Sequence, residues 1–182
     1  MSGHLAVIAG PTAVGKGTVV RYLLSEHPEL KLSISATTRE PRPGEQDGVD
    51  YYFWSKDRFE KAIVDGALLE YAKVHGNNYY GTPKQPVVEA LSRGETIILE
   101  IDLQGARLVK ESLPEAVTIF IQPPSWEELV RRLTSRATES EDEQQNRLET
   151  AKVELAAATE FDHVVVNDEV AKCATRILEL LT

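Results

Sequence analysis

The sequence is poor in cysteine, and Cys173 is the only one among its 182 residues. A lone cysteine excludes an internal disulfide framework and a cysteine metal cage, so we expect a buried thiol. The four histidines are scattered without ligand spacing, which argues against a protein-bound zinc ion. No apolar run reaches membrane-spanning length, and the first residues lack the charged segment and apolar core of a signal sequence. Together these absences predict a cytoplasmic protein with no membrane anchor.

Basic residues are also in the minority, since 20 Lys and Arg stand against 29 Asp and Glu, giving a net charge of -9. This balance argues against a protein that coats nucleic acid or an acidic membrane, although it allows a local basic pocket. Hydrophobic residues make up 42% and charged residues 27%, as in a folded domain and unlike a disordered chain. The length fits one globular domain and leaves the oligomeric state open.

Short apolar runs alternate with helical patterns along most of the chain. The runs typical of β-strands are residues 5–9, 32–35, 96–101, 117–121 and 163–166. The helical patterns are at residues 18–25, 83–92, 104–111, 125–133 and 170–181. This alternation predicts an α/β fold in which helices flank both faces of a parallel sheet. We expect ligands at the carboxyl ends of its strands.

Two segments depart from this alternation. Residues 37–81 contain several prolines, an aromatic run, a helical pattern at 56–64 and two strand-like runs around a turn. This composition predicts an inserted, mostly antiparallel lobe. Residues 131–147 alternate basic and acidic side chains over two predicted helices joined by a short link.

The sequence GPTAVGKGT follows the first strand-like run directly and precedes a helical pattern. Backbone N–H groups at a helix N-terminus bind phosphate, glycines let the chain wrap the anion closely, and a lysine adds charge. This context predicts a nucleotide-binding loop. Its residues are Gly10, Pro11, Thr12, Ala13, Val14, Gly15, Lys16, Gly17 and Thr18.

The loop departs from the usual pattern at one position. Phosphate-binding loops normally carry Ser or Thr directly after the lysine, where the hydroxyl holds Mg²⁺. Here Gly17 takes that place, and the hydroxyl comes one residue later on Thr18. Thr18 is then free to bond an α- or β-phosphate, while Mg²⁺ is held mainly by phosphates and water, as this ion allows.

The segment SISATTREPRPGEQDGVDY, residues 33–51, places Arg39 and Arg42 three residues apart and ends at Tyr51. Guanidinium groups bind phosphate through paired hydrogen bonds, and a phenol adds a neutral donor. Beside a Gly-Lys loop, this segment closely resembles the GMP-binding segment of guanylate kinases. The resemblance continues in LLEYAKVHGNNYYGTP, IILEIDLQGA, RRLTSRATES, NRLETAKVEL and HVVVND, and so covers nearly the whole chain.

Similarity to guanylate kinases implies a P-loop NTPase-type core, an inserted GMP-binding lobe and an arginine-bearing helical lid that closes over two nucleotides. The implied single domain, residues 1–182, has its core at 1–36, 83–124 and 160–182, its lobe at 37–82, and its lid with the following helix at 125–159. The implied reaction converts ATP and GMP, and also dGMP, into ADP and a guanosine diphosphate. Mg²⁺ is the implied cofactor, and the partners are these small molecules.

The resemblance also implies the residues that hold GMP. Its phosphate would contact Arg39, Arg42, Tyr51 and Tyr80. Its base would be read by Ser35, Glu70 and Thr82. The pattern around Glu70 leaves open whether this side chain faces solvent. Asp102 would lie between the base and the metal's waters, and Glu100 competes for that role.

On the ATP side, the resemblance implies that Lys16 holds the β- and γ-phosphates and that Asn167 contacts adenine. Arg136 and Arg147, together with Arg132, would move in with the lid. Phosphoryl transfer depends mainly on alignment and charge stabilisation, and the attacking GMP oxygen is already anionic. The sequence accordingly has no evident catalytic histidine or cysteine.

Two other functions compete with this hypothesis. Guanylate-kinase-like domains of scaffold proteins keep the fold but bind peptides, and they generally lose parts of the loop or the lid arginines. This chain retains Lys16, Arg136 and Arg147. A kinase for another nucleoside monophosphate is the closer alternative, because Gly17-Thr18 also resembles the adenylate kinase loop.

Overall fold

The computed structural model describes residues 3–135 and 140–182. Five parallel strands form its central sheet, in the order β2-β7-β1-β8-β9. These strands are β1 (Leu5–Ala9), β2 (Lys31–Leu32), β7 (Ile97–Glu100), β8 (Val117–Gln122) and β9 (His163–Val166). The α/β prediction is confirmed. No helix in the described ranges is long and apolar enough to cross a membrane.

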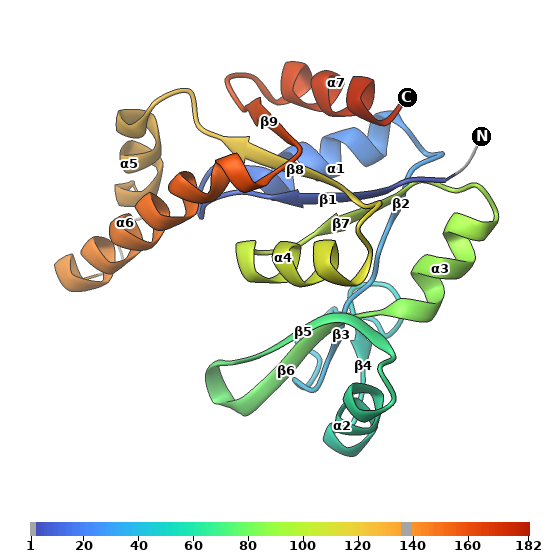
Figure 1. The fold of residues 1–182 in the computed structure, drawn as a ribbon. Coiled ribbons are helices and arrows are strands. Elements are labelled where there is room, and N and C mark those ends of the chain that lie inside the picture. The colour runs from blue at the N-terminus through green and yellow to red at the C-terminus, as the bar shows by residue number, and fades with distance from the viewer. Residues whose placement is uncertain (1–2, 136–139) are drawn as a thin grey trace.

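Helices cover both faces of this sheet (Figure 1). α1 (Lys16–Glu26) and α7 (Val170–Leu181) pack on one face, where Ile8 and the predicted buried thiol of Cys173 join the same apolar cluster. α3 (Lys84–Ser92) and α4 (Leu103–Ser112) pack on the other face, which includes Val7. Side chains alternate along a strand, so β1 contributes to both halves of the core.

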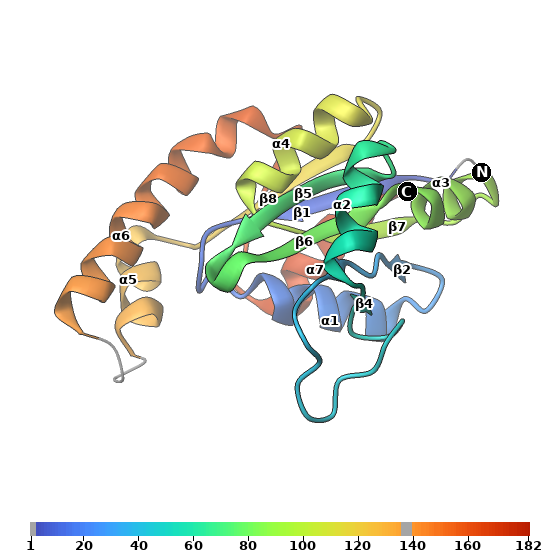
Figure 2. The same cartoon turned by 90° about the horizontal axis from the view of Figure 1, so that it is seen from below.

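The inserted lobe contains a second sheet in the order β4-β3-β6-β5. Its elements are β3 (Ala36–Thr37), β4 (Tyr52–Phe53), α2 (Lys56–Val64), β5 (Leu68–Val74), the 3₁₀ turn η1 (His75–Asn77) and β6 (Asn78–Pro83). β6 pairs antiparallel with both β3 and β5, and only β3 with β4 is parallel. The β5–β6 hairpin lies beneath the core in Figure 1, and Figure 2, seen from below, shows it in front of the core with α2 beside it. The mostly antiparallel lobe is confirmed.

The predicted lid region contains α5 (Trp126–Thr134) and α6 (Glu141–Ala156), followed by the 3₁₀ turn η2 (Ala157–Glu160). Each helix has a serine N-cap, and Ser140 forms a complete capping box with Glu143. α5 and α6 lie side by side at one end of the molecule and share an apolar cluster of Leu129, Leu133 and Ala151 (Figures 1 and 2). Arg136 lies outside the described residues.

The predicted bounds of the second core strand, residues 32–35, are wrong. β2 ends at Leu32, and after Ser33 donates to the Ile98 carbonyl at 2.8 Å the chain leaves the core sheet. It enters the lobe sheet as β3, where Ala36 pairs with Gly81. The expected division between residues 36 and 37 therefore cuts through β3, and the division between 82 and 83 cuts through β6. Lobe strands begin and end closer to the core than the sequence pattern indicates.

Candidate nucleotide-binding site

The glycine loop wraps around a cavity of about 580 Å³ between β1 and α1. Ala13 (φ 67°) and Gly15 (φ 89°) adopt left-handed backbone conformations, which turn the chain into the helix. α1 begins at Lys16, two residues earlier than predicted. Loop residues 10–18 all line the cavity, together with Arg21, Asp102, Arg132, Ser135 and Glu154. A loop whose backbone curls around a cavity at a helix N-terminus is suited to phosphate.

Lys16 is anchored at the carboxyl end of β7. Its Nζ donates to the carbonyl of Ile101 at 2.9 Å. Burial lowers the pKa of Lys16, and the nearby carboxylates of Glu100, Asp102 and Glu154 oppose that shift. A phosphate bound beside this ammonium group would favour its charged form in the same way.

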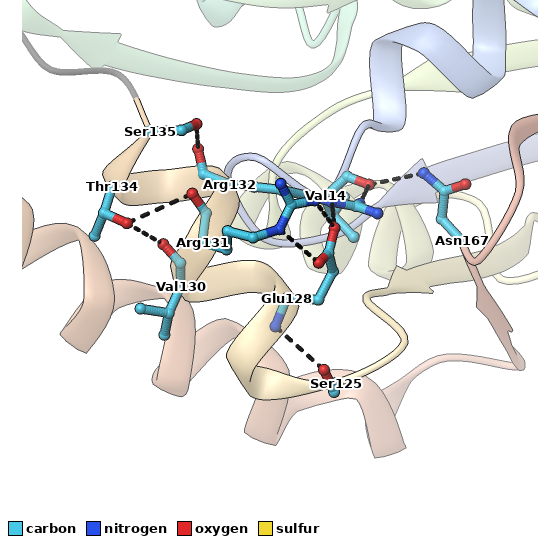
Figure 3. A network of polar contacts seen from close by, with 9 residues as sticks. All are labelled: Val14, Ser125, Glu128, Val130, Arg131, Arg132, Thr134, Ser135 and Asn167. Carbon is cyan, nitrogen blue, oxygen red and sulfur yellow. Dashed lines mark hydrogen bonds and ion pairs between the residues drawn. The ribbon is translucent and has the colours of Figure 1, made fainter.

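Two side chains predicted to bind ATP brace the loop from outside. The Val14 carbonyl accepts hydrogen bonds from Asn167 Nδ2 at 2.8 Å and from Arg132 Nη1 at 3.1 Å (Figure 3). Asn167 follows β9 and is only 4% exposed, while Arg132 also binds Glu128 and lines the cavity. The structure thus places both residues at the loop, and the adenine contact of Asn167 stays a prediction.

A second cavity, of about 330 Å³, lies against the lobe. Its lining includes Ser35, Tyr51, Glu70, Tyr80 and Asp102. Asp102 also lines the loop cavity, so the two cavities adjoin at this residue. One carboxylate oxygen of Asp102 accepts the Gly105 N–H at 2.7 Å and caps α4, which fixes its direction.

Glu70 faces this cavity, and its direction, which the sequence left open, is settled. It pairs in register with Thr82 across β5 and β6, and Thr82 Oγ1 donates to Glu70 Oε1 at 2.6 Å. Burial raises the pKa of Glu70, the Thr82 hydrogen bond lowers it, and the Asp102 carboxylate raises it further. A half-buried carboxylate held in this way is an acceptor for a pair of N–H groups.

The Arg39 guanidinium is held by three side chains near the same cavity. It donates to both carboxylate oxygens of Glu45, at 2.9 and 3.0 Å, and to the Tyr80 hydroxyl at 3.2 Å. Its carbon lies 5.4 Å from the centre of the Tyr51 ring. The contacts with Glu45 and Tyr80 raise the pKa of Arg39, and Glu45 contributes most. The side chain of Arg42 is exposed, although its backbone N–H also binds Glu45, at 2.7 Å.

Charged side chains in or beside these cavities that were not predicted from the sequence include Glu45, Arg21 and Glu154. Glu45 lies within the arginine segment, and its spacing from Arg39 offered a signal. Arg21 offered another, because it lies one helical turn after the loop. Glu154, on α6, approaches the Thr12 N–H at 3.4 Å from 142 residues away, and no local pattern marks such a contact. Burial raises the pKa of Glu154.

The structure locates the lid arginines less fully than it locates the loop residues. Arg132 lines the loop cavity, whereas Arg147, on α6, is half-buried and is absent from the described lining of both cavities. Its role stays a prediction.

A parallel α/β core, a glycine loop between its first strand and helix, and an adjoining cavity in an inserted lobe define a P-loop kinase. Within this class, the chain belongs to the guanylate kinase family, whose family model, described as guanylate kinase, matches residues 2–182. It is 60% identical to a guanylate kinase of Leifsonia xyli subsp. xyli over 98% of this chain and 70% of that protein. It is 56% identical to one of Cutibacterium acnes, over 98% and 89%. The crystal structure of guanylate kinase from Anaplasma phagocytophilum superposes with a TM-score of 0.75 at 32% identity, covering 99% of this chain and 85% of that one.

Proposed function

We propose that this protein transfers the γ-phosphoryl group of ATP to GMP, and to dGMP, forming ADP and the guanosine diphosphate. The observation that carries this proposal is the meeting of two cavities at Asp102, one built around a phosphate loop and the other around the Glu70–Thr82 pair. A donor phosphate and an acceptor nucleotide bound there would face each other.

The donor side would hold ATP through loop N–H groups and Lys16. Main-chain N–H groups of the loop, at the start of α1, would bind the phosphates, while Lys16 would place a point charge at the β- and γ-phosphates. Arg132 reaches the same cavity from α5 and would add a second charge. The hydrogen bond from the Asn167 side chain to the Val14 carbonyl supports the curled conformation of the loop.

The acceptor side would read guanine through Glu70 and hold its phosphate through Arg39 and Tyr80. Guanine presents N1–H and an exocyclic amine side by side, and one carboxylate can accept both. Adenine places an acceptor nitrogen at the same edge, which would leave the carboxylate unpaired. Ser35 and Thr82 add hydroxyls that can donate or accept. Arg42 and Tyr51 would complete the phosphate site.

In the transfer, a phosphate oxygen of GMP forms a bond to the γ-phosphorus as the bond from that phosphorus to the β,γ-bridging oxygen breaks. The bridging oxygen keeps the electron pair and leaves as part of ADP. The acceptor oxygen is already anionic, so no strong general base is needed, and the enzyme acts by alignment and charge stabilisation. Lys16, Arg39, Arg147 and, from the undescribed segment, Arg136 are the proposed sources of that charge. Closure of the lid would exclude water as a competing acceptor.

Mg²⁺ is the proposed cofactor. The oxygen-rich surroundings of Lys16, with the carboxylates of Glu100 and Asp102 and the hydroxyl of Thr18 close to the loop, fit a hard divalent cation. When bound, Mg²⁺ withdraws charge from the phosphates of ATP. Because Gly17 provides no hydroxyl, we propose that phosphates and water supply most of its ligands, with Thr18 or Asp102 as the protein's contribution.

The decisive experiment is a coupled assay of ADP release with GMP, dGMP, AMP and UMP offered separately as acceptors. Rapid release with GMP and dGMP, and little with AMP or UMP, is expected. Preferential use of AMP or UMP would identify a kinase for another base, and absence of release with every acceptor would favour a peptide-binding scaffold. Fractionation of the native cells tests the cytoplasmic location that the sequence predicts.

A further inference from the structure

Arg21 lines the loop cavity although it lies outside the glycine motif. It is on α1, three residues after Thr18 and four after Gly17, so its side chain points back along the helix toward the loop. Its Nη2 donates a hydrogen bond to Thr18 Oγ1 at 3.3 Å. The guanidinium is therefore attached to the loop through a neutral hydroxyl.

Arg21 differs from Arg39 and Arg132 in its partners. Arg39 is paired with Glu45, and Arg132 with Glu128. In residues 3–135 and 140–182, the Thr18 hydroxyl is the single hydrogen-bond partner of the Arg21 guanidinium. Guanidinium groups form paired hydrogen bonds with phosphate oxygens, and this one has donors to spare at the edge of a phosphate cavity.

Gly17 leaves the space that Arg21 enters. A Cβ at position 17 would lie 3.3 Å from Arg21 Nη1 and 3.4 Å from Glu100 Oε1, which is tight for the guanidinium. Position 17 is the place where loops of this type usually carry the hydroxyl that holds Mg²⁺. The Arg21 guanidinium and the Glu100 carboxylate thus flank the place that a side chain at position 17 would occupy.

We propose that Arg21 is a further phosphate-binding residue of the ATP site and that it orients the hydroxyl of Thr18 toward the nucleotide. Thr18 Oγ1 accepts a hydrogen bond from Arg21, so the hydroxyl hydrogen points elsewhere and can donate to an α- or β-phosphate oxygen. The other N–H groups of Arg21 place positive charge beside the gap at Gly17. This charge partly replaces the neutralisation that a hydroxyl-bound Mg²⁺ supplies in the usual loop. The inference rests on the proposed use of ATP as donor.

The test measures ADP binding by calorimetry, with Mg²⁺ and with EDTA, for the wild type, Arg21→Ala and Arg21→Gln. Loss of one charged contact to phosphate should raise the Kd of Arg21→Ala for ADP by about tenfold in EDTA, with a smaller effect in Mg²⁺. Arg21→Gln keeps the length of the side chain and should lose nearly as much, because the charge is gone. Arg93→Ala is the matched control, since Arg93 is exposed, paired with Glu95 and distant from the loop motif. Its Kd should equal that of the wild type.

A double-mutant cycle tests the orienting role. If Arg21 directs the Thr18 hydroxyl, Arg21→Ala and Thr18→Ala will together cost less than the sum of their separate effects. Additive losses would contradict the orientation of Thr18, and Kd values within twofold of the wild type in both buffers would overturn the whole inference. ADP binding requires neither acceptor nor turnover. A wild-type protein that binds ADP normally but fails to phosphorylate GMP would therefore refute the proposed function alone.

Discussion

The two halves of the site are built from different parts of the chain. The donor half is a continuous loop, residues 10–18, shaped by left-handed backbone at Ala13 and Gly15 and offering N–H groups of the main chain. The acceptor half is assembled from side chains spread between Ser35 and Asp102, on β5, β6 and the segments around them. Its members are already bonded to one another, as Glu70 is to Thr82.

This difference determines what each half can tolerate. Main-chain N–H groups are unchanged by most side-chain substitutions. The loop should therefore be sensitive to substitution mainly where a side chain carries charge or where an added Cβ would collide with a neighbour. Side-chain acceptors have particular protonation states and partners, so the lobe should be sensitive to changes that preserve shape but alter charge.

Lys16→Met should lower kcat/KM for ATP by roughly a hundred- to a thousandfold, the range for loss of one strong electrostatic contact in a transition state. Its ammonium group is the charged side chain that the loop itself supplies to the β- and γ-phosphates. GMP affinity should stay within a few fold, because Lys16 lies outside the described lining of the lobe cavity. Steady-state kinetics with varied ATP, together with calorimetry for GMP, provide the check. An equal loss in GMP binding would mean that the halves do not act separately.

Glu70→Gln should lower kcat/KM for GMP by roughly a hundredfold or more, since hydrogen bonds to a charged acceptor contribute about 1.5–3 kcal/mol each. The amide keeps the shape of the side chain and can still accept from Thr82, but it turns a donor toward the guanine N–H groups. Activity toward AMP should change far less, so the preference for GMP over AMP falls. Kinetics with both acceptors measure this ratio. An unchanged ratio would show that the base is read elsewhere.

The two loop glycines should respond very differently to alanine. A Cβ at Gly15 would lie 2.8 Å from Asn167 Nδ2, and φ at this residue is 89°. Gly15→Ala should therefore cost about 1–3 kcal/mol through backbone strain and also displace the brace on Val14. Gly17→Ala meets only the ends of two flexible side chains and should retain ATP use within a few fold. Thermal unfolding and the KM for ATP separate the two variants, and equal losses would contradict this account of the loop.

The same contrast explains which parts of the site could be predicted from the sequence. The loop and the helix after it come from adjacent residues, so GPTAVGKGT and its flanking patterns were enough to locate it. The contact of Glu154 with Thr12 joins residues 142 positions apart, and the position of α6 depends on packing that no local pattern encodes. The lobe lies between these cases, because family resemblance proposed Glu70 while its direction became clear only from the β5–β6 register.

The helices and strands were likewise predicted best where they depend on adjacent residues. Long apolar runs such as β1 and β8 were located closely, because each is buried on both faces of the sheet and contains little else. β2 and β3 have only two residues each, and their pairing with β7 and β6 decides where the chain leaves one sheet for the other. The helix predicted at residues 125–133 was also located closely, because its Ser125 cap is a local interaction.

Glu70→Gln should also stabilise the protein at neutral pH. The pKa of Glu70 is raised by burial, so the folded state binds this proton more tightly than the unfolded state. The stability associated with that proton is present at low pH and is lost as the pH rises through the raised pKa. The variant has no charge to bury, so its Tm should exceed that of the wild type at pH 8 and the gap should close toward pH 4. Melting curves across this range give the answer, and a variant less stable than the wild type at pH 8 would contradict it.

The smallest effect is expected at Glu45, which supports the acceptor phosphate site without lining the described part of either cavity. Arg39 and the Arg42 N–H hold the pKa of the Glu45 carboxyl below its usual value, with Arg39 contributing most. Glu45→Gln keeps one oxygen acceptor but loses the paired charge, which leaves Arg39 less firmly oriented. The pair is still partly exposed, with 15% and 20% of the two side chains accessible, and Arg39 keeps its hydrogen bond to Tyr80, so KM for GMP should rise only about two- to fivefold while kcat changes less. Glu95→Gln, which breaks the exposed pair with Arg93, is the control and should alter neither constant. A hundredfold rise in the KM of Glu45→Gln for GMP would show that the orientation of Arg39 depends completely on Glu45. The acceptor half would then tolerate the loss of a supporting side chain no better than the loss of Glu70.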